Sequence, residues 1–264
     1  MLKVPQSSIW GSTKDYLSAR QDEIDALVDY PAKVAKAKSS WEKKNAKVFE
    51  GLRGLLADLC QGARRCNYCE DSVADEVEHI WPKKFYPDKT FKWENYLFAC
   101  GPCNGSSKRG QFALFDAMSN PVDLVRRTND LAVEPMAGAA VFIDPRVDDP
   151  FDFIELDLAT GIYVPCAPPG EISFVRAEYT IKVLGLNKRD YLVRARRNAY
   201  ASYLDSARQY VVRKHAGAPC SELTQRIKEI SERHHPSVWA EMKRLSTIPA
   251  HSAIFKAAPE LLST

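Results

Sequence analysis

Apolar residues recur at intervals of three and four along residues 14–60, which is the spacing of one face of an α-helix. Pro31 cannot continue a helix, so we predict two helices here, with Gly62 as the C-cap of the second. We interpret residues 1–62 as a helical segment that packs on the rest of the chain. The recurring positions are Tyr16, Ile24, Leu27, Val28, Val34, Trp41, Val48, Leu52, Leu55 and Leu56.

The helical spacing is lost at residue 63 and returns only near residue 176. Residues 63–117 are predicted to form short strands and turns, and residues 118–175 are rich in Asp, Pro and Gly. Short strands are predicted in this second part, with a tight turn between the last two. Their positions are 141–143, 153–158 and 162–164, and the turn is 159–161.

Residues 176–264 again carry the helical pattern. A helical stretch over 176–214 is predicted to break near Gly185 and Asn187, and Pro236 separates two further helices at 221–233 and 237–245. The whole pattern predicts an α+β fold in which helical segments flank a strand-containing core. We divide it into 1–62, 63–117, 118–175 and 176–264.

The composition is that of an ordinary globular protein. Of 264 residues, 45% are hydrophobic and 27% charged. No apolar run approaches the roughly 18 residues of a membrane span, and the first residues lack the pattern of a secretory signal. We therefore expect a soluble, cytoplasmic protein with no membrane partner.

Charge is distributed unevenly, although the net charge is only +3. Residues 79–115 carry six basic side chains against two acidic ones, and residues 176–214 carry ten against three. Residues 144–157 reverse this, with six acids and one arginine. The latter two blocks are either solvated surfaces or contacts for DNA or a protein partner.

Four of the seven cysteines form two Cys-x2-Cys pairs separated by residues 70–99. The pairs are Cys66 with Cys69 and Cys100 with Cys103. This spacing is typical of a structural zinc site with four thiolate ligands, and such a site contributes on the order of 10 kcal/mol to folding. Cys60, Cys166 and Cys220 are scattered and are not assigned to the site.

The residues between the cysteine pairs change the interpretation from a zinc ribbon to an enzyme. Glu78-His79 is followed by Asn95, then by Asn104 directly after Cys103, with Lys108 and Gly110 downstream. Taken together, this order resembles the HNH endonucleases. The resemblance implies a ββα-metal core, stapled here by zinc, that hydrolyses phosphodiester bonds in DNA.

The reaction suggests a role for each residue. Hydrolysis needs a deprotonated water and a cation beside the developing negative charge. A neutral imidazole such as His79 can take the proton, and Glu78 and Asn104 offer oxygen ligands for Mg²⁺ or Mn²⁺. The resemblance assigns these same roles, and it makes Asn95 a structural residue that orients His79. Asn104 occupies a position where the family often has His.

Three basic residues of this region are candidates for binding the substrate: Lys83, Lys108 and Arg109. Lys108 follows Asn104 by four residues, so a helix that starts near Cys103 would place both on one face, with Lys108 near a phosphate. A solvated lysine is an equally good interpretation of Lys108.

A narrower resemblance extends over residues 60–200. Glu70, the stretches 78–83 and 93–95, and the downstream stretches 143–150 and 180–187 are similar to the HNH nuclease subunits of Septu-type and retron-linked anti-phage defence systems. That resemblance implies a partner, an ATPase of the ABC/SMC type. The ATPase would be another chain, because this sequence contains no Gly-x4-Gly-Lys-Ser/Thr motif.

Three other functions are compatible with parts of this sequence. A stand-alone restriction or homing nuclease would ordinarily carry its own sequence-reading module, and none is recognisable. A non-catalytic zinc module that binds nucleic acid or protein would not need His79, Glu78 and Asn104. A nuclease acting on RNA is a further alternative. The DNA target, the trigger and the oligomeric state are not encoded in any recognisable motif.

Overall fold

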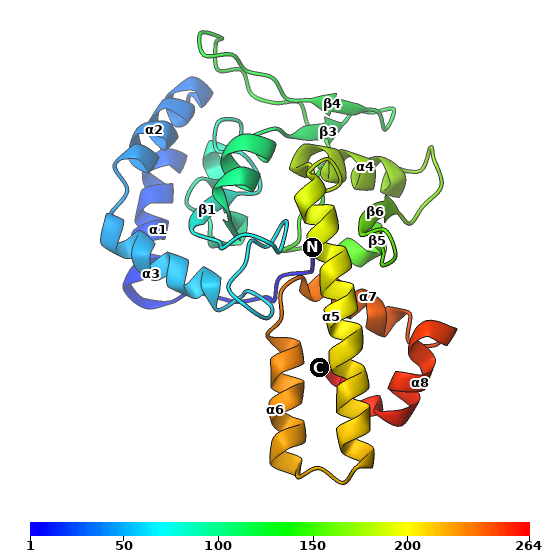
Figure 1. Cartoon of the computed structure of the whole chain (residues 1–264). Helices are drawn as coiled ribbons and strands as arrows, with labels where there is room; N and C mark the ends of the chain where they lie inside the picture. The colour runs from blue at the N-terminus through cyan, green and yellow to red at the C-terminus, as the bar shows by residue number, and fades with distance from the viewer.

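The computed structural model describes residues 1–264 and begins with three helices rather than two (Figure 1). These are α1 (Gly11–Asp25), α2 (Tyr30–Glu42) and α3 (Ala46–Ala57). Asp29 caps α2 by accepting a hydrogen bond from the Ala32 amide at 2.9 Å, and Pro31 lies in its first turn. Asn45 caps α3 in the same way, so a second break separates α2 from α3.

The prediction that Gly62 caps the last of these helices is wrong. α3 ends at Ala57, with Asp58 as its C-cap. Gly62 nevertheless has a positive φ of 74°, so it serves a turn in the loop that follows.

An antiparallel pair of strands forms the centre of the next segment. β1 (Glu76–His79) pairs with β2 (Tyr96–Ala99), with Glu78 opposite Leu97 and His79 opposite Tyr96. The connecting loop holds the short 3-10 turns η1 (Pro87–Lys89) and η2 (Trp93–Asn95). A π-helical segment, η3 (Pro102–Lys108), follows β2 directly.

Two further strand pairs occupy the third segment. β3 (Ala113–Phe115) pairs with β4 (Pro121–Asp123), and β5 (Ile154–Asp157), preceded by the 3-10 turn η4 (Pro150–Asp152), pairs with β6 (Ile162–Pro165). The β5–β6 pair and its turn confirm the sequence-based prediction. Asp157 fixes that turn by accepting a hydrogen bond from the Ala159 amide at 2.9 Å.

The predicted strand at 141–143 is wrong. Only Ala140 makes a single bridge, to Leu114, and residues 141–143 form no ladder. These three residues are apolar and all of them are buried, and a short buried run has no periodicity that separates a strand from other structure. The β3–β4 pair was not predicted.

Five helices complete the chain: α4 (Ile172–Leu184), α5 (Asp190–His215), α6 (Cys220–Ser231), α7 (Pro236–Arg244) and α8 (Pro249–Ala257). A 3-10 turn, η5 (Pro259–Ser263), follows them. The predicted break at Gly185 is confirmed, since this glycine caps α4 with φ of 60°. None of the helices combines the length and the apolar character that a transmembrane span requires.

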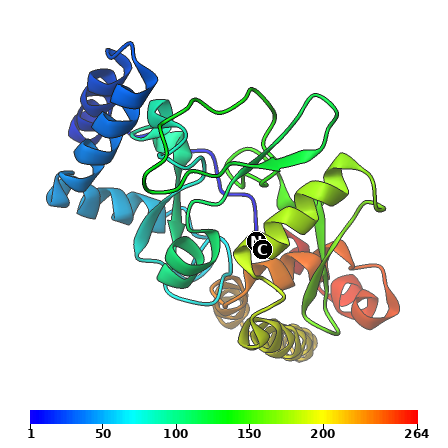
Figure 2. The same ribbon diagram turned by 90° about the horizontal axis from the view of Figure 1, so that it is seen from above.

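The helices surround the strands unevenly. Figures 1 and 2 show α1–α3 together on one side of the β1 region, while α5 and α6 extend away from the body of the protein. A cluster of 11 buried residues packs α1–α3 against β2. The larger core of 34 buried residues draws on all four predicted segments, from Met1 to Leu261, so these segments do not have separate cores.

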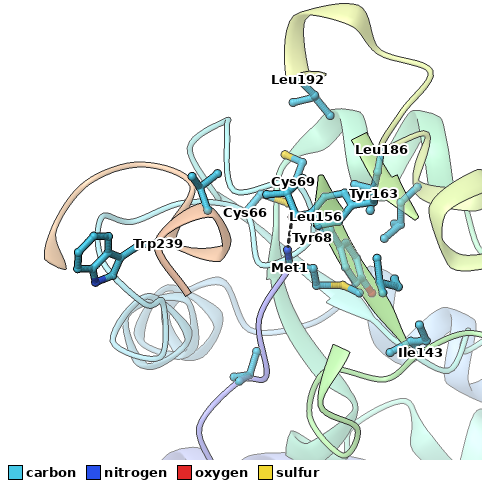
Figure 3. Close-up of a cluster of buried hydrophobic side chains, with 14 of the residues drawn as sticks. Met1, Cys66, Tyr68, Cys69, Ile143, Leu156, Tyr163, Leu186, Leu192 and Trp239 are labelled. Atoms are coloured by element: carbon cyan, nitrogen blue, oxygen red, sulfur yellow. Dashed lines mark hydrogen bonds between the residues drawn. The ribbon is translucent and has the colours of Figure 1, made fainter. Parts of the chain in front are cut away.

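Residues 117 and 175 are the ends of two of the predicted segments. Residue 117 lies in the turn between the paired strands β3 and β4, and residue 175 lies inside α4. Figure 3 shows part of the large core, whose members include Met1, Cys66 and Cys69. The Met1 amino group is buried there, 3.0 Å from a Glu70 carboxylate oxygen and 2.7 Å from the Tyr163 hydroxyl.

Candidate active site and metal centre

The four paired cysteines meet in one buried cluster. Cys66 and Cys69 precede β1, and Cys100 and Cys103 follow β2, so the antiparallel pairing of these strands brings the two pairs together. All four sulfur atoms lie within 4.8 Å of one another, and those of Cys69 and Cys100 are 3.8 Å apart. Zinc–sulfur bonds of about 2.3 Å in a tetrahedron require sulfur atoms about 3.8 Å apart. The cluster therefore has the size and the donor set of a zinc site.

The surroundings of the cluster also fit a cation. Burial raises the pKa of the Cys66 thiol well above its ordinary value, so four thiolates in this place need a positive ion to compensate their charge. Arg189, between α4 and α5, donates a hydrogen bond to the sulfur of Cys103 at 3.3 Å. The first cysteine pair turns tightly, with the Cys66 carbonyl accepting from the Glu70 amide at 2.8 Å.

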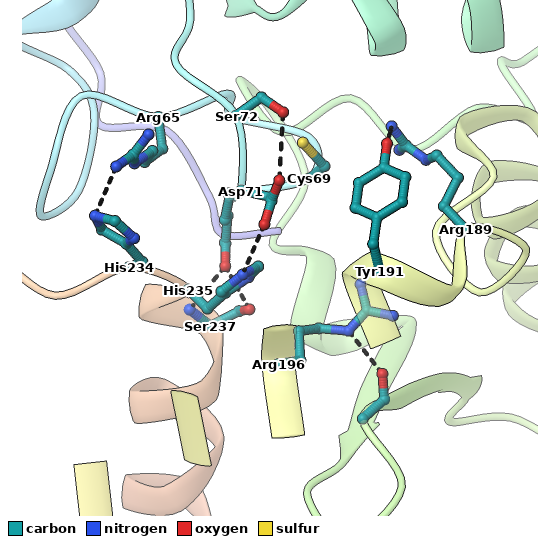
Figure 4. A network of polar contacts seen from close by, with 12 residues as sticks. Arg65, Cys69, Asp71, Ser72, Arg189, Tyr191, Arg196, His234, His235 and Ser237 are labelled. Carbon is teal, nitrogen blue, oxygen red and sulfur yellow. Dashed lines mark hydrogen bonds and ion pairs between the residues drawn. The ribbon is translucent and has the colours of Figure 1, made fainter. Parts of the chain in front are cut away.

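A polar network joins the first cysteine pair to the start of α7 (Figure 4). Glu70 accepts hydrogen bonds from the amide and the hydroxyl of Ser237 at 3.1 and 2.5 Å. Nε2 of His235 lies 3.5 Å from Oδ1 of Asp71, and a guanidinium nitrogen of Arg65 lies 2.7 Å from Nε2 of His234. The start of α7 thus contacts the first cysteine pair through Glu70, which the resemblance included, and through Ser237, which no sequence pattern singled out.

His79 ends β1 and is buried in an aromatic setting. Its ring packs edge-on against Trp41 of α2 and Tyr96 of β2, with centroids 4.2 and 5.3 Å away. Its Nε2 lies 2.9 Å from the Thr90 carbonyl, which can only accept, so Nε2 carries the proton. Nδ1 has no hydrogen-bond partner within the chain and keeps its lone pair. Burial, followed by the nearby charge of Lys83, lowers the pKa of His79 well below its ordinary value.

Glu78 and Lys108 form a buried ion pair. The Lys108 ammonium is fully buried and lies 2.6 Å from Oε1 of Glu78. It also donates to the carbonyl oxygens of His79 and Ile80 at 2.9 and 3.0 Å. All three of its N–H groups are therefore used, and the predicted contact between Lys108 and a phosphate is replaced by a structural role. Oε2 of Glu78 has no partner within the chain.

Glu76 positions Asn104. The amide nitrogen of Asn104, in η3, donates to a carboxylate oxygen of Glu76 at 2.7 Å. A carboxylate only accepts, so this bond leaves Oδ1 of Asn104 as a free acceptor. No sequence motif singled out Glu76, although its alternation with Glu78 along β1 places both on one face of the strand.

Asn95 connects the two ends of the loop between β1 and β2. Its Oδ1 accepts from the Trp81 amide at 2.7 Å, and its Nδ2 donates to the carbonyls of Trp81 and Lys89 at 3.0 and 2.9 Å. Thr90, whose carbonyl holds His79, directly follows Lys89. Asn95 therefore acts on the imidazole indirectly. It holds the Lys89 carbonyl, and the carbonyl of the next residue, Thr90, accepts the hydrogen bond of His79.

One cavity of about 300 Å³ gathers most of the candidate residues. Glu78, His79 and Asn104 line it together with Lys83 and Arg109, while Asn95 and Lys108 lie behind its wall. Trp41 and Lys84 also line the cavity and were not predicted as site residues. Trp41 belongs to a helix remote in sequence, so no local pattern could have placed it here.

These features define a mixed α+β protein in which a buried four-cysteine cluster adjoins a cavity with one histidine, oxygen acceptors and cationic side chains. No protein-family model matches the sequence. The chain is 31% identical over 143 residues to Septu protein PtuB of Bacillus thuringiensis, covering 52% of this chain and 42% of the relative. It is 26% identical over 162 residues to Septu protein PtuB of Bacillus mycoides (strain KBAB4), covering 53% and 48%.

The chain thus spans less than half the length of each of these two relatives. Their similarity supports the relationship to Septu proteins that the sequence motifs indicate.

Proposed function

We propose that this protein is a metal-dependent endonuclease of the HNH kind that cuts DNA as part of an anti-phage defence complex. One observation carries the proposal. His79, with its Nδ1 lone pair free, lines the same cavity as Glu78 and Asn104, each of which has one side-chain oxygen without a partner.

The state of His79 suits a general base. Burial keeps the imidazole neutral by lowering its pKa, and the Thr90 carbonyl holds the proton on Nε2. Nδ1 can then take a proton from a water molecule in the cavity. The fixed ring, packed against Trp41 and Tyr96, keeps that nitrogen in one orientation.

The two free oxygens suit a hard divalent cation. Oε2 of Glu78 and Oδ1 of Asn104 are the ligand types that Mg²⁺ and Mn²⁺ prefer, and they leave positions for water and phosphate. A cation bound there would supply positive charge where negative charge develops on the phosphate. Lys83, Lys84 and Arg109 line the same cavity and would bind the phosphodiester backbone.

The defence role rests on the similarity to the two Septu proteins. We further propose an ABC/SMC-type ATPase as the partner, encoded as a separate chain. This sequence contains no phosphate-binding loop motif, which supports the proposal that ATP is bound by the partner chain.

Cleavage of plasmid and phage DNA tests the enzyme proposal. Wild type, His79→Ala and the matched control His215→Ala, which changes an exposed histidine, would be compared with Mg²⁺ or Mn²⁺ present. We expect His79→Ala to lose about 10²-fold or more in rate and His215→Ala to cut like wild type. The same reactions on RNA of matched sequence test the choice of DNA.

Equal cutting by wild type and His79→Ala would overturn the assignment of the base. If no protein cuts alone, the assay is repeated with the ATPase from the same defence system. Absence of cutting there, combined with a defence phenotype that survives His79→Ala, would favour the non-catalytic zinc module instead.

A further inference from the structure

A dense group of lysines lies at the corner between α2 and α3. Residues 31–49 contain six lysines and a single acid, Glu42. Four of the lysines, Lys38, Lys43, Lys44 and Lys47, lie near the end of α2 or the start of α3, and we call these four the lysine corner. Lys38, Lys43 and Lys47 are exposed to solvent.

The lysine corner adjoins the proposed active-site cavity through Trp41. The Trp41 side chain lines the cavity, and the ammonium groups of Lys44 and Lys83 lie 4.8 and 5.1 Å from its ring centroid. Lys38 precedes Trp41 by three residues and therefore lies on the same side of α2. Positively charged side chains thus extend from Lys83 in the cavity wall to Lys44 and the exposed end of α2, with the Trp41 indole between them.

The charges of this corner are not neutralised by the protein itself. None of its four lysines forms an ion pair. The basic α5 differs, because Arg194 and Arg208 there pair with Asp190 and Asp205 of the same helix. Unpaired exposed lysines are the side chains that release counterions when they bind phosphates.

We infer that the lysine corner binds the phosphate backbone of duplex DNA and leads one strand into the cavity that contains His79. This inference rests on the proposed nuclease function and names the surface that holds its substrate. A protein partner is a poorer fit, because no large apolar side chain of α2 is strongly exposed between the lysines. α2 has 13 residues and is about 20 Å long, roughly the length of six base pairs.

Fluorescence anisotropy with a labelled 30-base-pair duplex tests this inference. Binding is measured between 50 and 200 mM salt without added divalent cation, and a denaturing gel verifies that the strand stays intact. We compare wild type with the triple variant Lys38→Gln, Lys43→Gln and Lys47→Gln. Because three phosphate contacts are lost, we expect the affinity of the variant to fall by about tenfold or more. We also expect the slope of log K against log salt to be smaller in magnitude by about 2 to 3.

Two matched variants complete the design. The triple variant Lys38→Arg, Lys43→Arg and Lys47→Arg keeps the charge and should bind like wild type, which separates charge from any change in folding. The triple variant Arg194→Gln, Arg197→Gln and Arg208→Gln removes equal charge from α5 and should change the affinity less than about twofold.

Wild-type affinity in the Lys→Gln variant, a larger loss in the α5 variant, or no binding by wild type would each overturn the inference. The nuclease proposal is judged separately by cleavage. Lysine-dependent binding without cleavage, both alone and with the ATPase present, would contradict that proposal and leave this surface assigned. Cleavage with unchanged binding in the Lys→Gln variant would do the reverse.

Discussion

The ammonium group of Lys108 lies 2.6 Å from Oε1 of Glu78, and neither side chain is more than 5% exposed. The same ammonium holds the carbonyl oxygens of His79 and Ile80. One lysine thus ties the segment after the second cysteine pair to the end of β1, at the residues proposed to carry the reaction. Burial raises the pKa of Glu78, and the adjacent charge of Lys108 opposes that effect.

Lys108→Met should be strongly destabilising. The substitution leaves a buried carboxylate and two carbonyl oxygens without their donor, a loss of about 3–5 kcal/mol in the free energy of unfolding. Urea denaturation of wild type and variant measures it. Lys14→Met, at an exposed position of α1, is the matched control and should stay within about 0.5 kcal/mol. A similar small change in both variants would mean that the buried pair contributes little.

Purified protein should contain one zinc ion per chain, held by the four buried cysteines. Elemental analysis by mass spectrometry should find the metal in wild type and in Cys166→Ser, whose cysteine is exposed. Cys103→Ser should lose most of it and melt at a lower temperature, because metal binding contributes to folding. Full zinc occupancy in Cys103→Ser would contradict the four-thiolate site.

Stability should depend on pH through His79. Below pH of about 6.5 the unfolded chain binds a proton at His79, while the folded chain, in which burial lowers the His79 pKa, does not. This contribution to stability is therefore complete above pH 6.5 and is lost as the pH falls.

Urea denaturation between pH 8 and pH 5 checks this prediction against His79→Ala. The free energy of unfolding of wild type should fall more steeply than that of the variant, by at most about 1.4 kcal/mol per pH unit. A difference between the two proteins that is constant over this range would show that His79 titrates normally in the folded state.

Asn95→Asp should damage the loop that holds His79. The aspartate can still accept from the Trp81 amide, but it cannot donate to the carbonyls of Trp81 and Lys89 and places a charge against them. We expect the free energy of unfolding to fall by about 2–4 kcal/mol, because two carbonyl acceptors lose their donor and a charge is buried. Asn198→Asp, at an exposed position of α5, is the control for thermal unfolding and should melt close to wild type. Equal melting temperatures would remove Asn95 from the framework of the site.

The sequence by itself determined the features that depend on spacing along the chain. The two Cys-x2-Cys pairs predicted a metal-binding cluster, and the structure brings their four sulfur atoms together. Alternation and turn residues predicted β5 and β6, and Gly185 marked the end of α4. These features are local, because a few neighbouring residues fix a turn, a cap or a strand.

Only the tertiary structure decided how the candidate residues are used. A helical spacing from Asn104 to Lys108 could not tell a solvated lysine from a buried one, and Lys108 is buried because Glu78 and two carbonyls of β1 and the following loop lie opposite it. Trp41 of α2 and Thr90 of the loop between β1 and β2 likewise reach His79 only in the folded chain. Burial and pairing depend on which surfaces meet in three dimensions, and the order of residues does not encode this in any short pattern.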